Sequence, residues 1–313
     1  MLTLATVNNM TMFLQHLFDA LALGSLYALG ALGIGLIFGV MKLVNFAHGD
    51  YISVCVFALI VPSTSAIASP LLGNLPSWVI VPTVLAIGAG LSVLSELVLF
   101  RHIRNSNPAT MMVTSFALGF VIQHLLLMLY SSRPKALNLW PQLNLPVEFF
   151  GARFPALQLL SIAVTAITLI LLVMFLKRSR LGVEMRAAAE DFNMARMLGV
   201  KANKVILGAF ALSGGLAGAI GLMMITQTGV ADIRMGVPIM LVAFIATVIG
   251  GLGSLIGAVI AAFAIGLVSV SLQAWLPLDA RPYRDALVYG LVIVVLIWRP
   301  QGLFVPATHK ERV

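Results

Sequence analysis

The stretch LQLLSIAVTAITLILLVMFL occupies residues 157–176 and is followed at once by Lys177, Arg178 and Arg180. As a helix, this uncharged stretch rises about 30 Å, which is the thickness of the hydrocarbon core of a bilayer. Cations gather at the cytoplasmic ends of membrane segments. The stretch therefore predicts a membrane-spanning helix that ends in the cytoplasm.

The composition of the whole chain supports this class. Of its 313 residues, 60% are hydrophobic and 10% charged, and the mean hydropathy is +1.05. A soluble domain carries about 25% charged residues, so these charges are too few to cover a water-facing surface. They are also too few for the basic face that nucleic-acid binding needs, despite a net charge of +8. Cys55 is the single cysteine, which excludes an intramolecular disulfide.

Apolar runs without a central Lys or Arg recur along the chain, and two of them, 47–61 and 236–249, are short. We predict an all-α polytopic membrane protein. Residues 1–313 form a single transmembrane domain, a bundle of roughly 8–9 transmembrane helices with one or two short or interrupted segments. Short segments in matching halves often mark a transport path. The runs fall at 14–40, 47–61, 78–100, 110–130, 157–176, 205–227, 236–249, 254–275 and 283–298.

The basic residues predict the orientation. Seven of the 19 Lys and Arg lie in 177–204, which makes this segment cytoplasmic. Counting outward gives nine passes, with the N-terminus outside and the C-terminus inside; 13 Lys and Arg then lie inside and 6 outside. A re-entrant course of either short segment lowers the count, and the N-terminal side can then be reversed.

Polar residues cluster between the first two apolar runs, at Asn45, His48 and Asp50. One interpretation is a local turn, with Asn45 capping a helix that starts near Phe46 and Asp50 in its first turn. The other is a place on a translocation path, because ionisable groups at membrane depth are costly and usually face a cavity or a partner. His48 and Asp50 are two positions apart, so on a helix they do not share a face.

Other polar residues lie within or beside the apolar runs. Glu96 precedes Arg101 by five positions, which favours an interfacial ion pair or a snorkelling contact. Gln123 and His124 favour a helix-to-helix hydrogen bond over a substrate contact. The sequence holds no Gly-x-Ser-x-Gly elbow and no deep pair of carboxylates, so we expect no enzyme and no catalytic or metal-binding residues.

The cytoplasmic segment predicts a short amphipathic helix at about 184–199. Met185, Ala188, Phe192, Ala195 and Gly199 fall on one helical face, and glycine is a common helix stop. Such a helix lies flat on lipid, inserts into the groove of a protein partner, or simply connects two spans. Its small, Ala-rich face and mixed charge favour a protein partner.

Glycines interrupt the apolar region at 250–253. Their pattern is not a phosphate loop, because no Lys-Ser/Thr follows and no strand precedes it. We therefore expect this chain to bind no nucleotide of its own. If it pumps, the energy comes from another subunit or from an ion gradient.

Taken together, these stretches resemble the LivH-type membrane permease of branched-chain amino acid ABC importers. The motifs occur in order along nearly the whole chain. They are Leu23-Gly-Ser-Leu-Tyr-Ala-Leu29, Asn45-Phe-Ala-His-Gly-Asp50, Arg186-Ala-Ala-Ala-Glu-Asp191 with Ala195 and Gly199, Gly250-Gly-Leu-Gly-Ser254 with Gly257-Ala258, and Arg299-Pro-Gln-Gly-Leu-Phe304.

The resemblance implies a subunit of the bacterial inner membrane that works with a second permease, two cytoplasmic ATPases that use ATP, and a periplasmic binding protein. The helix at 184–199 then corresponds to the coupling helix, with Phe192 as an apolar knob and Glu184, Arg186 and Asp191 as polar contacts. The cargo is a branched-chain amino acid, or urea, short amides or aromatic acids in related importers. An alternative is a stand-alone secondary transporter driven by an ion gradient.

Overall fold

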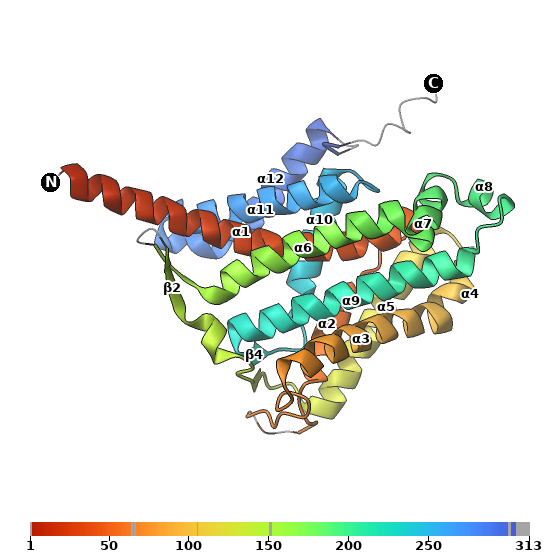
Figure 1. Cartoon of the computed structure of the whole chain (residues 1–313), viewed down its shortest axis with the longest axis horizontal. Coiled ribbons are helices and arrows are strands. Elements are labelled where there is room, and N and C mark those ends of the chain that lie inside the picture. Colours follow the sequence, from red (N-terminus) through yellow and green to blue (C-terminus); the bar gives the residue numbers. More distant parts are fainter. Residues whose placement is uncertain are drawn as a thin grey trace.

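The computed structural model describes residues 2–63, 65, 67–104, 106–149, 152–299 and 302–304, and it is mostly helical (Figure 1). The elements from the N-terminus to α6 are α1 Leu2–Met41, α2 His48–Phe57, α3 Ser77–Ser95, the π-helical turn η1 Glu96–Phe100, α4 Arg101–Ile103, α5 Pro108–Tyr130, β1 Lys135–Ala136, the 3-10 helix η2 Pro141–Asn144, β2 Pro146–Phe149, β3 Ala152–Pro155 and α6 Ala156–Arg178.

The remaining elements begin with two short helices that follow α6. They are α7 Arg180–Glu190, α8 Phe192–Met197, α9 Ala202–Thr228, β4 Val230–Ala231, α10 Gly236–Gly250, α11 Leu255–Trp275, the 3-10 helix η3 Leu278–Tyr283 and α12 Arg284–Trp298. Strand β1 pairs antiparallel with β4, and β2 with β3.

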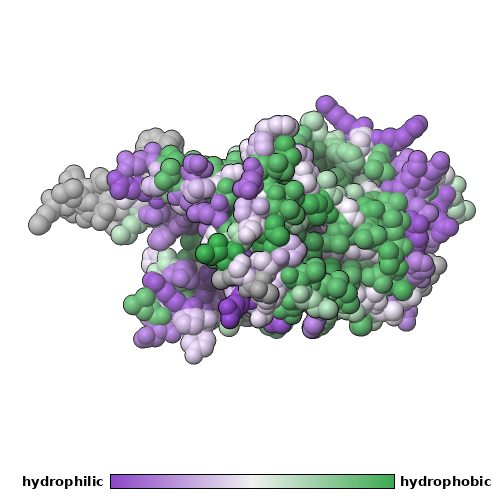
Figure 2. All heavy atoms as spheres, turned by 90° about the horizontal axis from the view of Figure 1, so that it is seen from below, coloured by the Kyte–Doolittle hydropathy of each residue, from purple (hydrophilic) through white to green (hydrophobic). Residues whose placement is uncertain are grey.

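Six helices in the described part of the chain are long and apolar enough to cross a bilayer: Thr11–Met41, Ser77–Ile103, Pro108–Tyr130, Ala156–Arg178, Ala202–Thr228 and Leu255–Trp275. Figure 2 shows a broad hydrophobic band with hydrophilic residues gathered at its ends. The prediction of an all-α polytopic membrane protein is confirmed. The two short runs are short helices, since α2 has 10 residues and α10 has 15.

Helix α1 lies at the centre of the bundle and packs on α6, α9, α10 and α11. Small residues permit this, because in lipid close backbone approach drives helix association. Gly24 faces Phe263 of α11, where a Cβ on the glycine would lie 2.7 Å from the ring. Ala28 and Ala31 on the same stripe are fully buried.

The closest contact between α3 and α9 is at Gly88 and Gly214. A Cβ on either glycine would overlap the carbonyl oxygen of the other. The neighbouring Gly215 has nothing within 4 Å of an added Cβ. The two adjacent glycines therefore lie on different faces of α9: Gly214 packs against α3, and Gly215 faces open space.

The two short segments touch each other. A Cβ on Gly49 of α2 would lie 2.9 Å from the carbonyl oxygen of Gly236, the first residue of α10. Each glycine lies in the first turn of a short helix: 10 and 15 residues rise about 15 and 22 Å, less than the roughly 30 Å of the hydrocarbon core. The two short segments therefore meet inside the bundle.

Two more of the quoted motifs also meet. Leu303 N–H donates to the carbonyl oxygen of Ile249 over 2.7 Å, and Phe304 lies against Gly251 and Gly257. Pro300 and Gln301 of the same tail motif lie outside the described residues. The glycines at 250–253 thus form a tight turn on which the tail packs, with Gly251 and Gly253 at positive φ.

Candidate functional site

Asn45 forms the turn that leads into α2. Its side chain is fully buried, and its Oδ1 accepts a hydrogen bond from Ala47 N–H over 3.1 Å. The helix begins at His48, two residues later than predicted, with Ala47 at the N-cap position. Asn45 therefore stabilises the turn ahead of the helix, and its Nδ2 reaches the hydroxyl of Tyr51 at 3.4 Å.

His48 points toward α1 and α9. Its Nδ1 lies 3.2 Å from Ser213 Oγ, and the ring packs against Gly33, where a Cβ would lie 2.6 Å from Cε1. The ring is fully buried, and its Nε2 has no hydrogen-bond partner among the described residues. Buried polar atoms are rarely left without a partner, so this nitrogen is an exception within the packed centre of the bundle.

Asp50 points to the opposite side, toward α5. Its Oδ1 accepts a hydrogen bond of 2.8 Å from Gln123 Nε2, and its Oδ2 lies against Gly119. The carboxylate lies in the first turn of α2, as predicted, where the helix dipole favours negative charge. The bond confirms Gln123 as a helix-to-helix contact. His124 instead bonds the Phe120 carbonyl of its own helix at 2.8 Å.

The three predicted residues thus surround the start of α2 but do not converge on one point. Asn45 bonds within its own turn, while His48 and Asp50 contact different helices. Together they join α2 to α9 and α5 through polar contacts inside an apolar bundle. Inside a bilayer no water is available to bond these groups, so neighbouring helices supply their hydrogen-bond partners.

The cytoplasmic segment differs from the prediction. The expected single helix over 184–199 is broken at Asp191, whose backbone is extended (φ −144°, ψ 105°). Its carboxylate accepts from Met194 N–H over 2.9 Å and so caps α8. Aspartate competes with helix continuation in this way, and it outweighs the helix propensity of the alanines before it. Gly199, at φ +89°, follows the end of the helix as predicted.

The predicted apolar face of this segment is turned inward. Met185, Ala188 and Ala195 are buried against the protein's own core, and Phe192 is half-buried there. Arg186 Nε donates to the Leu176 carbonyl over 2.9 Å, so Arg186 binds the end of α6.

The apolar side chains that remain exposed lie further on. Met194, Met197 and Leu198 are 54, 83 and 80% exposed. Glu184 lies half-buried on α7. With Val183 on α7, which is 46% exposed, the two methionines and Leu198 are the exposed large apolar side chains of this segment.

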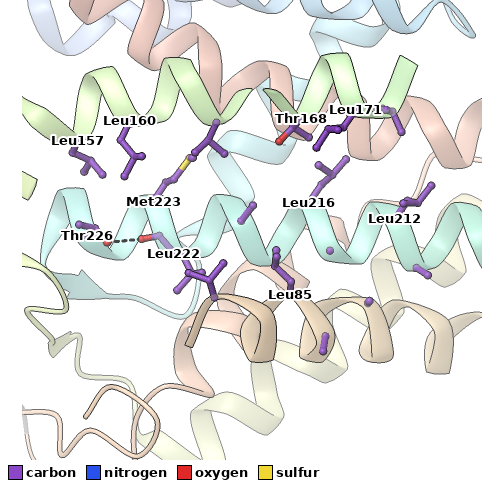
Figure 3. A pocket seen from close by; sticks show the side chains of 18 of the residues that line it. Leu85, Leu157, Leu160, Thr168, Leu171, Leu212, Leu216, Leu222, Met223 and Thr226 are labelled. Carbon is purple, nitrogen blue, oxygen red and sulfur yellow. Dashed lines mark hydrogen bonds between the residues drawn. The ribbon is translucent and has the colours of Figure 1, made fainter. Parts of the chain in front are cut away.

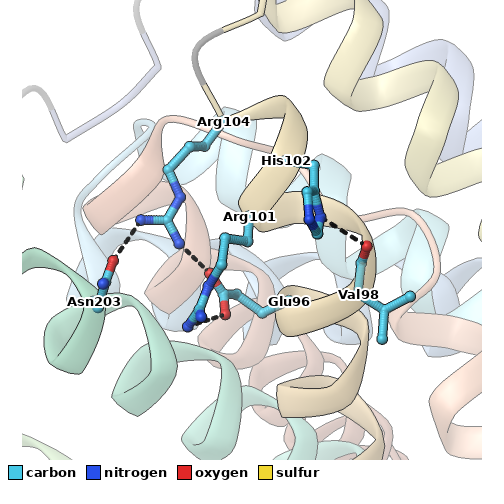
Figure 4. A network of polar contacts seen from close by, with 6 residues as sticks. All are labelled: Glu96, Val98, Arg101, His102, Arg104 and Asn203. Carbon is cyan, nitrogen blue, oxygen red and sulfur yellow. Dashed lines mark hydrogen bonds and ion pairs between the residues drawn. The ribbon is translucent and has the colours of Figure 1, made fainter.

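A buried carboxylate lies in η1, the turn that continues α3 (Figure 4). Glu96 has no exposed surface and pairs with Arg104, while Arg101 lies 3.5 Å from its other oxygen. Arg104 Nη1 continues to Asn203 Oδ1 of α9 at 2.7 Å. The predicted ion pair is confirmed, and it joins α3 and α4 to the start of α9.

Several residues that contact the predicted site residues were not predicted from the sequence, among them Ser213, Gly33 and Arg104. Ser213 lies in the middle of a long apolar run, and no spacing pattern singles it out as the partner of His48. Lys135 is also fully buried, with Nζ 2.6 Å from the Ser63 carbonyl.

The fold and these contacts define a multi-pass helical membrane protein with a buried polar centre and a basic segment between α6 and α9. The family model described as branched-chain amino acid transport system / permease component matches residues 16–296. The chain belongs to this family. Because its members are transport permeases, the prediction of a transport protein rather than an enzyme is confirmed.

Two relatives match nearly end to end. The high-affinity branched-chain amino acid transport system permease protein LivH of Salmonella typhimurium is 29% identical over 93% of this chain and 95% of its own length. The permease protein BraD of Pseudomonas aeruginosa is 30% identical over 93% of this chain and 95% of its own. The permease protein LivM of Escherichia coli is 30% identical over 52% of this chain and 39% of its own.

Proposed function

We propose that this chain is a permease subunit of an ATP-driven importer in the bacterial inner membrane, with a branched-chain amino acid as its cargo. The observation that carries the proposal is the match of the permease family to residues 16–296, together with relatives that align end to end. Both relatives are named for branched-chain amino acid transport.

The partners follow from the same proposal. Since LivH and LivM are both described as permease proteins and both align with this chain, a second permease pairs with it. Two ATPases bind on the cytoplasmic side, and a periplasmic binding protein delivers the cargo. The exposed Met194, Met197 and Leu198 support the ATPase contact, because apolar side chains on a water-facing segment need a cover. ATP is used by those subunits, and this chain carries no cofactor.

The course of the chain completes the proposal. With α2, α10 and α12 counted beside the six long spans, the chain makes nine membrane segments, with its N-terminus outside and its C-terminus inside. The contact of α2 with α10 at Gly49 and Gly236 places two short segments together inside the bundle. Because such segments line transport paths in other carriers, Asn45, His48 and Asp50 at the start of α2 belong to the translocation path.

The test is uptake of labelled leucine, isoleucine and valine by cells that naturally carry this chain, before and after deletion of its gene. Deletion should abolish high-affinity uptake of one or more of these tracers, and a plasmid copy should restore it. Labelled urea, a short amide and an aromatic acid serve as comparison cargoes. Loss of one of these alone would assign a different cargo.

The energy source separates the importer from a secondary transporter. Arsenate lowers cellular ATP and should stop uptake, whereas a protonophore that collapses the ion gradient while ATP is maintained should leave it running. The opposite pattern would show that the chain works as an ion-driven carrier and would overturn the proposal.

A further inference from the structure

A long apolar groove runs between α3, α6 and α9 (Figure 3). Its volume is about 660 Å³. Along α6 its lining extends from Leu157 to Phe175, which is a rise of about 27 Å. Leu160 and Leu171 on its wall remain 40 and 56% exposed, so the groove is open along its length.

The lining excludes the proposed cargo as the occupant. None of the described residues that line the groove is charged, and its few polar groups include the hydroxyl of Thr226, which already bonds the Leu222 carbonyl at 2.7 Å. An amino acid would leave both its ammonium and its carboxylate without partners in this space. The cost of burying unpaired charges is prohibitive. The groove therefore takes an apolar occupant.

The length of the groove suits a slender apolar occupant. An extended acyl chain can lie along its rise of about 27 Å, and the exposed Leu160 and Leu171 leave it open to the bilayer. A helix of a second permease is the competing occupant, and the variants proposed below distinguish the two.

The two ends of the groove differ. At one end η2 covers it with Trp140 and Leu143, and Asn144 Nδ2 fixes this cover to the Thr226 carbonyl over 2.7 Å. At the other end α6 finishes and α9 begins. The start of α7, which follows α6 directly, lies against α9 there, because Leu181 of α7 packs on Gly208.

Two cations lie at this second end, on the stripes that face the groove. Arg178 follows Phe175 by three positions on α6, and Lys204 precedes Ala211 by seven on α9. Both are exposed, and neither has an ion-pair partner among the described residues. They complement an anionic group at the mouth of an otherwise uncharged groove. Basic pockets between membrane helices on the cytoplasmic side bind anionic lipid headgroups in this way.

We infer that the groove between α3, α6 and α9 binds one anionic phospholipid of the cytoplasmic leaflet, with an acyl chain in the groove and its phosphate on Arg178 and Lys204. The lipid fills a slot that the three helices leave open. It also connects the end of α6 to the start of α9 across the base of the cytoplasmic segment.

The test uses the full-length permease, purified with the subunits that accompany it and equilibrated with phosphatidylcholine vesicles that contain phosphatidylglycerol. Native mass spectrometry then measures the retained phosphatidylglycerol. Replacing both cations (R178Q with K204Q) should weaken retention about 30-fold, which corresponds to about 1 kcal/mol for each cation near an anionic headgroup. The control K177Q with R196Q removes the same charge from the far side of α6 and from α8, and should retain lipid within twofold of the unaltered protein.

A second variant fills the groove. An added Cβ at Gly215 meets open space, so Gly215→Leu projects into the groove and should abolish retention. Gly290→Leu on α12 is the matched control, since Gly290 is equally open and lies outside the groove.

Three results would overturn the inference. One is equal phosphatidylglycerol retention by R178Q with K204Q and by its control. Another is phosphatidylcholine retained as tightly as phosphatidylglycerol. The third is a Gly215→Leu protein that keeps its lipid but loses the second permease, which would make the groove a subunit interface. The cation variants decide the question even if Gly215→Leu folds poorly.

Discussion

Gln123 Nε2 donates a hydrogen bond of 2.8 Å to Asp50 Oδ1 and so joins two helices whose residues are 73 positions apart. Asp50 is 3% exposed, and Gly119 leaves space for its second oxygen. Other polar contacts of α5 with α2 and the turn before it are made by Ser115, which accepts from Phe46 N–H, and by Tyr130, which donates to the Phe57 carbonyl. The Asp50–Gln123 bond lies between these two contacts along α5.

Removing one partner of the Asp50–Gln123 bond should lower the stability more than removing both partners. Gln123→Leu leaves the Asp50 carboxylate without its partner and should lower the stability of the purified permease by about 1–3 kcal/mol. Replacing both residues with leucine removes the unsatisfied group, so the double variant should be more stable than Gln123→Leu alone. Thermal unfolding in detergent measures both. A double variant that is less stable than the single one would show that the bond does not act as a pair.

Transport separates the two interpretations of Asp50. Asparagine keeps the oxygen that accepts from Gln123, so Asp50→Asn should fold and insert normally. If the carboxylate belongs to the translocation path, uptake should fall at least tenfold while the amount of protein in the membrane stays the same. Uptake at the normal rate would leave Asp50 with its local structural role only.

Gly214 and Gly215 of α9 allow a matched test of helix packing, because one is closely packed and its neighbour is not. Gly214→Ala places a Cβ against the Gly88 carbonyl and should destabilise the permease by about 1–3 kcal/mol through overpacking. Gly215→Ala meets nothing and should be neutral or stabilise by up to about 1 kcal/mol, since alanine favours a helix interior over glycine. Thermal stability by size-exclusion chromatography compares them. Equal effects at the two positions would contradict the close approach of α3 and α9.

Glu96 should support the η1 turn that continues α3. Its side chain is fully buried between Arg101 and Arg104, whose own side chains are 39 and 19% exposed, so its loss should cost less than that of a partner in a fully buried pair, which is about 3–5 kcal/mol. Glu96→Gln should still reduce the amount of folded permease, measured as monodisperse protein after extraction. Glu148→Gln is the control, because Glu148 pairs with Arg153 at the surface and such pairs contribute little.

Much of this fold follows from local chemistry. The length of an apolar run predicts a span, as at 157–176, and the first-turn position of Asp50 follows from the residues around it. The partners do not follow, because a single sequence does not say that Asp50 meets Gln123 or that His48 meets Ser213. The break at Asp191 was also missed: helix propensity and apolar spacing both favoured one continuous helix, but a capping carboxylate ended it.

The residues predicted to bind the proposed ATPases also have contacts within the chain. Phe192 is half-buried against the core, and Arg186 and Asp191 bond backbone groups of the chain itself. Replacing any of these three residues is therefore expected to disturb the permease's own fold as well as any docking.

Met197 and Leu198 give the sharper test, because both are at least 80% exposed and their replacement leaves the core intact. Substituting both with glutamate should lower ATPase co-purification more than tenfold, since charges cannot enter an apolar groove without a partner. The yield of inserted permease should stay normal. The control Val183→Glu changes an apolar residue of α7 that is 46% exposed. Normal ATPase recovery with M197E and L198E together would mean that the ATPases dock elsewhere on the cytoplasmic face.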